Sequence, residues 1–163
     1  MIINGKKVDS AEKTNIYNPY NKNIVGDISI ASDDDLKSLV NYSSNYKCDL
    51  NNNQKKLILE KTAISLEKNK KEFATIITQE TGLSMKDSIY EISRVINCAR
   101  YSIKVCDYVN SDITKNFIVD DINHPELKVI KEPLDLVLAI TPFNHPMNQV
   151  AHKIFPAIIS GAT

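Results

Sequence analysis

The residues with the clearest potential for chemistry lie near the end of the chain, where an apolar run passes into the turn Thr141-Pro142-Phe143-Asn144-His145. A carboxamide held at a fixed point can donate its N–H to an oxygen that gains negative charge during a reaction. Asn144 is therefore the first candidate for a catalytic group. The structural alternative is that Asn144 caps a helix beginning at Pro146, a role that asparagine fills readily.

The other reactive side chains favour structural interpretations. His145 and His152 form a pair whose spacing could suggest a metal site, but no third ligand accompanies them, and we expect no metal. Cys48, Cys98 and Cys106 lack C-x-x-C spacing, a pattern typical of reduced thiols rather than of disulfides or a zinc site. Cys98 and Cys106 fall on an expected helix, where a small buried side chain is favoured, so no cysteine is predicted to be catalytic.

The overall composition argues against several function classes. Twenty basic and twenty acidic side chains leave no formal net charge, so no global field attracts nucleic acid or anionic lipid, and neither is an expected partner. No apolar run approaches the roughly 20 residues that span a bilayer, and no secretory leader is recognisable. A length of 163 residues suits one domain, and we expect a cytoplasmic protein.

Helical patterns dominate the middle of the chain. Ser32 and the three aspartates after it predict a helix start. Apolar residues keep helical spacing from 55 to 80, with a break near Asn69, and Gly82 should end that helix. A longer helix should follow from 84 to 109.

Strand patterns occupy both sides of this helical region. The Asn4-Gly5 pair predicts a hairpin over residues 2–8, and alternating apolar residues predict a strand over 24–30. Residues 117–119 and 127–131 are predicted to form a second ribbon. That ribbon needs a partner, because an isolated ribbon is marginal in water.

The segment Leu134–Ile140 is predicted to be a strand buried on both faces of a parallel sheet, because only Asp135 interrupts its apolar run. The helix expected from Pro146 carries a wide apolar surface. Together they form a βα unit of the doubly wound kind, and open α/β sheets bind their ligands in the loop at the carboxyl end of such a strand. Asn144 lies in that loop.

Several segments also match a known pattern in order and spacing. They are Ile3–Lys6, Tyr17–Pro19, Gly26-Asp27, Glu80–Gly82, Glu132–Leu134, Ala139–Pro146, Val150–Ala157 and Gly161. Together they closely resemble the aldehyde dehydrogenase superfamily, and the proline-aromatic-asparagine-x-proline motif is the most specific among them. Asp135 departs from the glycine that many relatives carry. The resemblance covers the whole chain, which would be only the first third of a usual member.

The resemblance implies an α/β fold that is aldehyde dehydrogenase-like but incomplete. Residues 1–112 would form the amino-terminal hairpin and the helical part of the coenzyme-binding domain, residues 113–132 an oligomerisation ribbon, and residues 133–163 the first βα unit of a Rossmann-like sheet. A homo-oligomer, or association with a full-length subunit, is implied as well. Because a single strand leaves both of its edges uncovered, we expect the isolated chain to aggregate or oligomerise.

The resemblance also implies a chemistry. In family members a cysteine thiolate attacks a small-molecule aldehyde, and hydride leaves for NAD or NADP. Asn144 would donate to the developing oxyanion, while Ile140, Thr141, Pro142 and Phe143 would lie along the cofactor. The family's nucleophile and base match no residue of this chain, and G-x-G-x-x-G is absent, so we expect the isolated chain to be inactive.

Two other interpretations stay open. The chain could be a non-catalytic interaction fragment that pairs with a full-length subunit through its hairpin and ribbon, or an unrelated α/β binding protein that shares only the turn. The residues Thr141–Pro146 are most similar to relatives that handle small or anionic aldehydes, such as lactaldehyde, phosphonoacetaldehyde and glyceraldehyde 3-phosphate. Nothing in the sequence distinguishes NAD from NADP.

Overall fold

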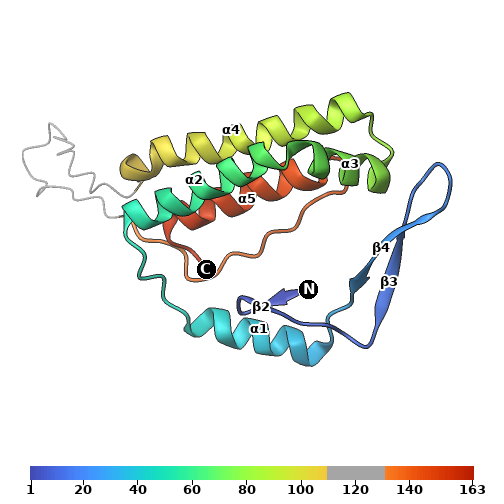
Figure 1. Ribbon diagram of the computed structural model, residues 1–163. Helices are drawn as coiled ribbons and strands as arrows, with labels where there is room; N and C mark the ends of the chain where they lie inside the picture. Colours follow the sequence, from blue (N-terminus) through green and yellow to red (C-terminus); the bar gives the residue numbers. More distant parts are fainter. Residues whose placement is uncertain (110–130) are drawn as a thin grey trace, which may run out of the picture.

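Four helices pack against one another to form the largest part of the structure (Figure 1). The computed structural model describes residues 1–109 and 131–163. The helices are α2 (Asn52–Lys68), α3 (Lys70–Thr81), α4 (Met85–Val109) and α5 (Pro146–Ser160), and α4 contacts the other three. Their apolar faces meet in a core that includes Leu59, Ile92, Val95, Ile96, Ala99 and Phe155. Removal of this apolar surface from water holds the bundle together.

The helix boundaries follow local capping signals. The predicted break falls at Asn69, whose side-chain Nδ2 donates to the carbonyl oxygen of Ser65 at 2.9 Å, and α3 ends at Gly82 with a φ of 78°. Both predictions are confirmed. The helix expected from residue 55 begins earlier, at Asn52, because Asn51 and Gln54 form a capping box in which each side chain accepts from the other's backbone N–H.

Two antiparallel hairpins precede the helices. β1 (Ile2–Ile3) and β2 (Lys6–Lys7) are joined by Asn4 and Gly5, which both have positive φ, as a type I′ turn requires. β3 (Lys13–Tyr17) pairs with β4 (Ile24–Ser29) in the second hairpin. The first hairpin and β4 confirm the predictions. No alternation predicts β3, since four of its five residues are exposed.

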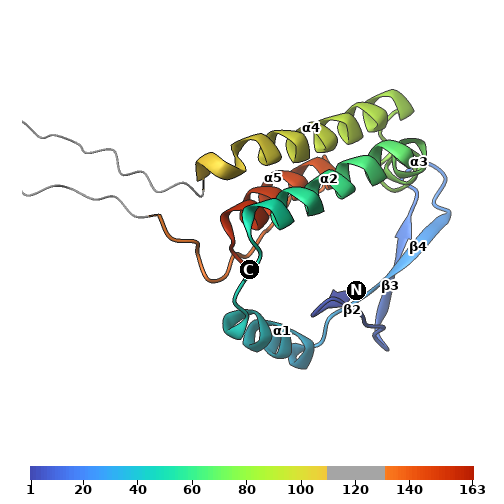
Figure 2. The same cartoon turned by 60° about the vertical axis from the view of Figure 1, so that its left-hand side comes forward.

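Helix α1 (Asp33–Asn45) lies apart from the bundle (Figure 2). The Ser32 hydroxyl accepts from the Asp35 backbone N–H, and the Asp35 carboxylate accepts from the Ser32 backbone N–H, so the predicted helix start is confirmed. Leu36 and Val40 on its apolar face are exposed, and α1 contains no buried residue. The stability of this helix therefore depends more on its capping bonds than on burial of its side chains.

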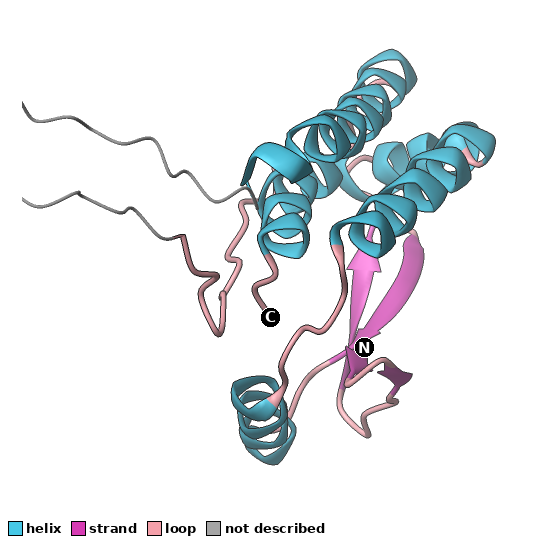
Figure 3. Ribbon diagram, turned by 90° about the vertical axis from the view of Figure 1, so that its left-hand side faces the viewer, coloured by secondary structure: helices cyan, strands magenta, loops and turns pink. Residues whose placement is uncertain are grey.

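The segment Leu134–Ile140 is not a strand, and the prediction that it is buried on both faces is wrong. It forms part of the loop that leads to α5 (Figure 3), and Leu138 and Ile140 are 83% and 76% exposed. A strand needs a neighbouring strand to satisfy its backbone groups. No strand within residues 1–109 or 131–163 pairs with this segment.

The predicted ribbon over 117–119 and 127–131 lies, apart from Lys131, outside the described residues. Of the helices that the structure describes, none is long and apolar enough to cross a membrane. The helix predicted after the apolar segment is confirmed as α5, with Pro146 at its start.

Candidate functional site

Asn144 lies in the bend that immediately precedes α5, and it is exposed. The structure does not show it as the cap of that helix. His145 occupies the cap position and makes no side-chain capping bond, and Pro146 follows as the first helical residue. Within the part of the chain that the structure describes, the Asn144 carboxamide has no hydrogen-bond partner. Its N–H groups are therefore available to a ligand.

A buried acid on α4 caps the helix in place of Asn144. Glu91 is 2% exposed, and its Oε1 accepts from the backbone N–H groups of Met147 at 2.8 Å and Asn148 at 3.0 Å. Its Oε2 lies 3.4 Å from Nδ1 of His145. A carboxylate at this end of a helix is stabilised by the helix dipole. Sequence reasoning missed Glu91, although an acid among the apolar positions of a predicted helix is a signal that it has a polar partner.

A buried base on α2 lies at the opposite end of the same helix. Lys55 is 7% exposed, and its Nζ donates to the carbonyl oxygen of Ile159 at 3.5 Å. The helix then ends at Gly161, which has a φ of 88°. A cation is favourable near the carboxyl end of a helix. Opposite charges from two other helices thus fix both ends of α5.

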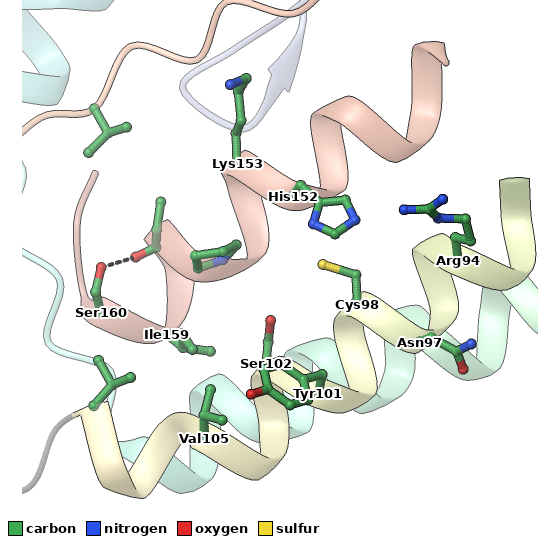
Figure 4. A pocket seen from close by; sticks show the side chains of 14 residues that line it. Arg94, Asn97, Cys98, Tyr101, Ser102, Val105, His152, Lys153, Ile159 and Ser160 are labelled. Carbon is green, nitrogen blue, oxygen red and sulfur yellow. Dashed lines mark hydrogen bonds between the residues drawn. The ribbon is translucent and has the colours of Figure 1, made fainter.

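A groove of about 900 Å³ runs between α4 and α5 (Figure 4). Arg94, Cys98 and His152 line one part of it, where their side chains gather, and Val105 and Ile159 line another. A guanidinium offers several donors in a plane and pairs well with carboxylate, sulfonate or phosphate. The groove therefore combines an apolar wall with a cationic side chain.

The remaining reactive side chains in the groove do not assemble a nucleophile or a metal centre. Burial raises the pKa of the Cys98 thiol, and a hydrogen bond with Ser102 offsets part of that effect. A thiol with a raised pKa is largely protonated near neutral pH and is a poor nucleophile. Across residues 1–109 and 131–163, no group of three His, Cys, Asp or Glu is placed to hold a metal ion.

The residues expected along the cofactor form the exposed path into the Asn144 bend. Ile140 and Phe143 are 76% and 89% exposed, Pro142 is exposed, and Thr141 is half-buried. Their apolar surface and their backbone groups are therefore accessible to a bound molecule. These four residues and Asn144 are consecutive in the sequence, and their role in binding a cofactor stays a prediction.

Comparison with known proteins gives a consistent result. A family model described as "Aldehyde dehydrogenase family" matches residues 7–163. The chain is 35% identical over 164 residues to a lactaldehyde dehydrogenase from Methanococcus aeolicus, covering 99% of the chain and 34% of that protein. It is 28% identical to a 3-sulfolactaldehyde dehydrogenase from Priestia megaterium, again covering 99% of the chain and 34% of the relative.

Solved structures agree with these relatives. An NADP-dependent glyceraldehyde-3-phosphate dehydrogenase from Bacillus halodurans, complexed with NADP, superposes with a TM-score of 0.89 at 26% identity, covering 99% of the chain and 35% of that structure. A betaine aldehyde dehydrogenase variant from Staphylococcus aureus, in complex with NAD+, superposes with a TM-score of 0.82 at 25% identity and covers 34% of that structure. These matches confirm the predicted fold class. The chain spans about a third of the length of the relatives it matches.

Proposed function

The chain belongs to the aldehyde dehydrogenase family, and on this premise we propose that residues 1–163 supply the amino-terminal part of an NAD(P)-dependent enzyme that oxidises a small, anionic aldehyde to its acid. One observation carries the proposal. The Asn144 carboxamide is exposed, has no partner among the described residues, and lies directly before a helix whose first turn is held by Glu91.

Asn144 acts on the aldehyde oxygen in this proposal. When a cysteine thiolate from outside residues 1–163 attacks the carbonyl carbon, negative charge gathers on the oxygen, and the side-chain N–H of Asn144 donates a hydrogen bond to it. The hydrogen bond stabilises the transition state most if the N–H already points at that position before the charge develops. Residues 1–163 by themselves are proposed to have no dehydrogenase activity.

The cofactor is proposed to lie along Ile140, Thr141, Pro142 and Phe143. The exposure of Ile140 and Phe143 suits this role, because their apolar surface can pack against the ribose and the nicotinamide. NAD or NADP, when bound, accepts the hydride that the aldehyde loses. The complexes of related structures with NAD+ and NADP support the same assignment.

Two observations support an anionic substrate. Arg94 and His152 line the groove between α4 and α5, and Arg94 can pair with an acidic group at the far end of a short aldehyde. Relatives of the chain are named for 3-sulfolactaldehyde, aspartate semialdehyde and sulfoacetaldehyde, which all carry such a group.

A substitution of Asn144 tests the proposal. The enzyme to use joins residues 1–163 to the remaining two-thirds of the Methanococcus aeolicus relative. Asn144→Ala should lower kcat for aldehyde oxidation by about 10²–10³, because one oxyanion donor is lost, with little change in KM. The matched control is Asn53→Ala, which removes an exposed asparagine near the start of α2. Equal rates for Asn144→Ala and the parent would overturn the proposal.

The second candidate, a non-catalytic fragment that pairs with a full-length subunit, has one observation in its favour. Leu138 and Ile140 expose apolar surface in a segment that pairs with no strand of the described chain. The unpaired backbone groups and apolar side chains of such a segment can bind another chain. Stable capture of a full-length subunit by residues 1–163, together with an inactive joined enzyme, would favour this candidate.

A further inference from the structure

Glu91 is a buried acid that the proposed chemistry does not use. It extends from α4, is 2% exposed, and contacts three residues around the start of α5, which are His145, Met147 and Asn148. We propose that Glu91 is a positioning residue, which fixes the turn before α5 and so sets where the Asn144 carboxamide points. This inference rests on the oxyanion role proposed for Asn144.

The backbone donors in the first turn of α5 show why Glu91 matters. Pro146 has no N–H, Met147 and Asn148 both donate to Glu91, and Gln149 donates to the carbonyl oxygen of His145 at 3.1 Å. Every donor of the turn therefore has a partner, and one carboxylate satisfies two of them. Without that carboxylate, two N–H groups would have to find water, and the turn would lose its attachment to α4.

Glu91 also contacts His145, the residue beside Asn144. Oε2 of Glu91 lies 3.4 Å from Nδ1 of His145, which is the residue that immediately follows Asn144. An anchored cap residue restricts the backbone on its amino-terminal side. A shift of about 1 Å in a catalytic donor is enough to lower a rate by about 10²-fold, so small changes in this turn have a large effect.

Lys55 provides the matched control. It is also a buried charge that holds α5, but it acts at the opposite end, through the carbonyl oxygen of Ile159. Lys55→Met should loosen the carboxyl end of the helix without disturbing the turn at Asn144. A purely structural role predicts the same behaviour for both charges, whereas a positioning role does not.

The first measurement is amide hydrogen exchange on the 163-residue chain. Glu91→Ala should speed exchange at Met147 and Asn148 by about tenfold or more, while Lys55→Met leaves those amides near the parent rate. Glu91→Gln keeps an oxygen acceptor and should restore most of the protection. If Glu91→Ala does not fold, Glu91→Asp gives the same test, because its shorter side chain cannot reach both amides. Unchanged protection at Met147 and Asn148 overturns the proposal.

The second measurement is activity of the joined enzyme described for Asn144. Glu91→Ala should lower kcat by about tenfold to a hundredfold with KM for the aldehyde nearly constant, Glu91→Gln should recover most of it, and Lys55→Met should keep the parent kcat. In the Asn144→Ala background, Glu91→Ala should add no further loss. A full additional loss, or a normal kcat in Glu91→Ala, refutes positioning through Asn144. A normal kcat in Asn144→Ala instead refutes the proposed function.

Discussion

In the proposed function, Arg94 is the residue that distinguishes an anionic aldehyde from a neutral one. It extends from α4 into the groove beside His152, and neither Arg94 nor His152 shares in the contacts that hold α5. The neighbouring Arg100, on the same helix, lies 3.7 Å from Glu67 and outside the groove. The two arginines therefore differ in partner and position, although they carry the same charge.

Arg94→Met should raise KM for an aldehyde with a sulfonate or carboxylate group by about tenfold, and should leave KM for a neutral aldehyde of the same length unchanged. The reason is that methionine replaces the apolar part of the arginine side chain but has no group that can pair with an anion. Arg100→Met serves as the control and should change neither value. Steady-state kinetics of the joined enzyme with both substrates measure the effect. An equal rise in KM for both aldehydes would contradict anion recognition.

How far the site could be predicted depended on how local its determinants are. The exposed turn at Asn144 follows from two prolines and an apolar run that are adjacent in sequence, and the structure places it where the sequence indicates. The acceptor that caps α5 could not be predicted from the sequence, because Glu91 lies 57 residues from Asn148. No local rule connects them. Asn148 itself is buried, and its Oδ1 has no hydrogen-bond partner among the described residues. Nothing in the structure explains why an asparagine stands at this position.

At the scale of elements, the turn between β3 and β4 lies close to the end of α3. The turn between these strands contains Pro19, and a Cβ added to Gly82, at the end of α3, would lie 3.0 Å from Pro19 Cγ. Gly82 also has a φ of 78°, a conformation that side chains rarely adopt. A glycine is needed here both for the helix end and for the approach of the hairpin.

Gly82→Ala should therefore lower the free energy of unfolding by about 1–2 kcal/mol, from the left-handed backbone alone, with an additional cost from the Pro19 contact. Gly26→Ala in β4 is the control, because a Cβ there meets nothing within 4 Å and its φ is not left-handed. Urea denaturation of both variants measures the difference. Similar midpoints for the two variants would contradict the prediction, because the backbone cost at Gly82 remains even if Pro19 moves away.

Elements with local signals were predicted well, and the element with a distant partner was not. Caps at Ser32, the break at Asn69 and the end at Gly82 are all specified by residues within one turn. The strand predicted over Leu134–Ile140 requires a neighbour in the same sheet, which the described residues do not provide. An apolar run indicates a preference for burial, but the partner that buries it cannot be read from the run itself.

At the scale of the whole molecule, apolar side chains remain uncovered along the loop that leads to α5. The most exposed of them are Leu134, Leu138, Ile140 and Phe143, at 70%, 83%, 76% and 89%. Such a concentration of exposed apolar surface favours association over a solvated monomer.

The 163-residue chain should self-associate, as a sedimentation coefficient that rises with protein concentration would show. Replacing both Leu138 and Ile140 with lysine should reduce this association, because it adds two charges to the exposed segment. The double replacement of Lys6 and Lys7 with arginine, in β2, keeps the charge and serves as the control. A compact monomer at every concentration would contradict the prediction.

The two charges that hold α5 also constrain the order in which the chain acquires its structure. Lys55 precedes its partner Ile159 by 104 positions, and Glu91 precedes Asn148 by 57. During synthesis on a ribosome, α2 and α4 emerge and can pack before α5 has left the exit tunnel. On this order of synthesis, α5 docks onto helices that have already packed, and we expect the bend at Asn144 to acquire its geometry in the same step.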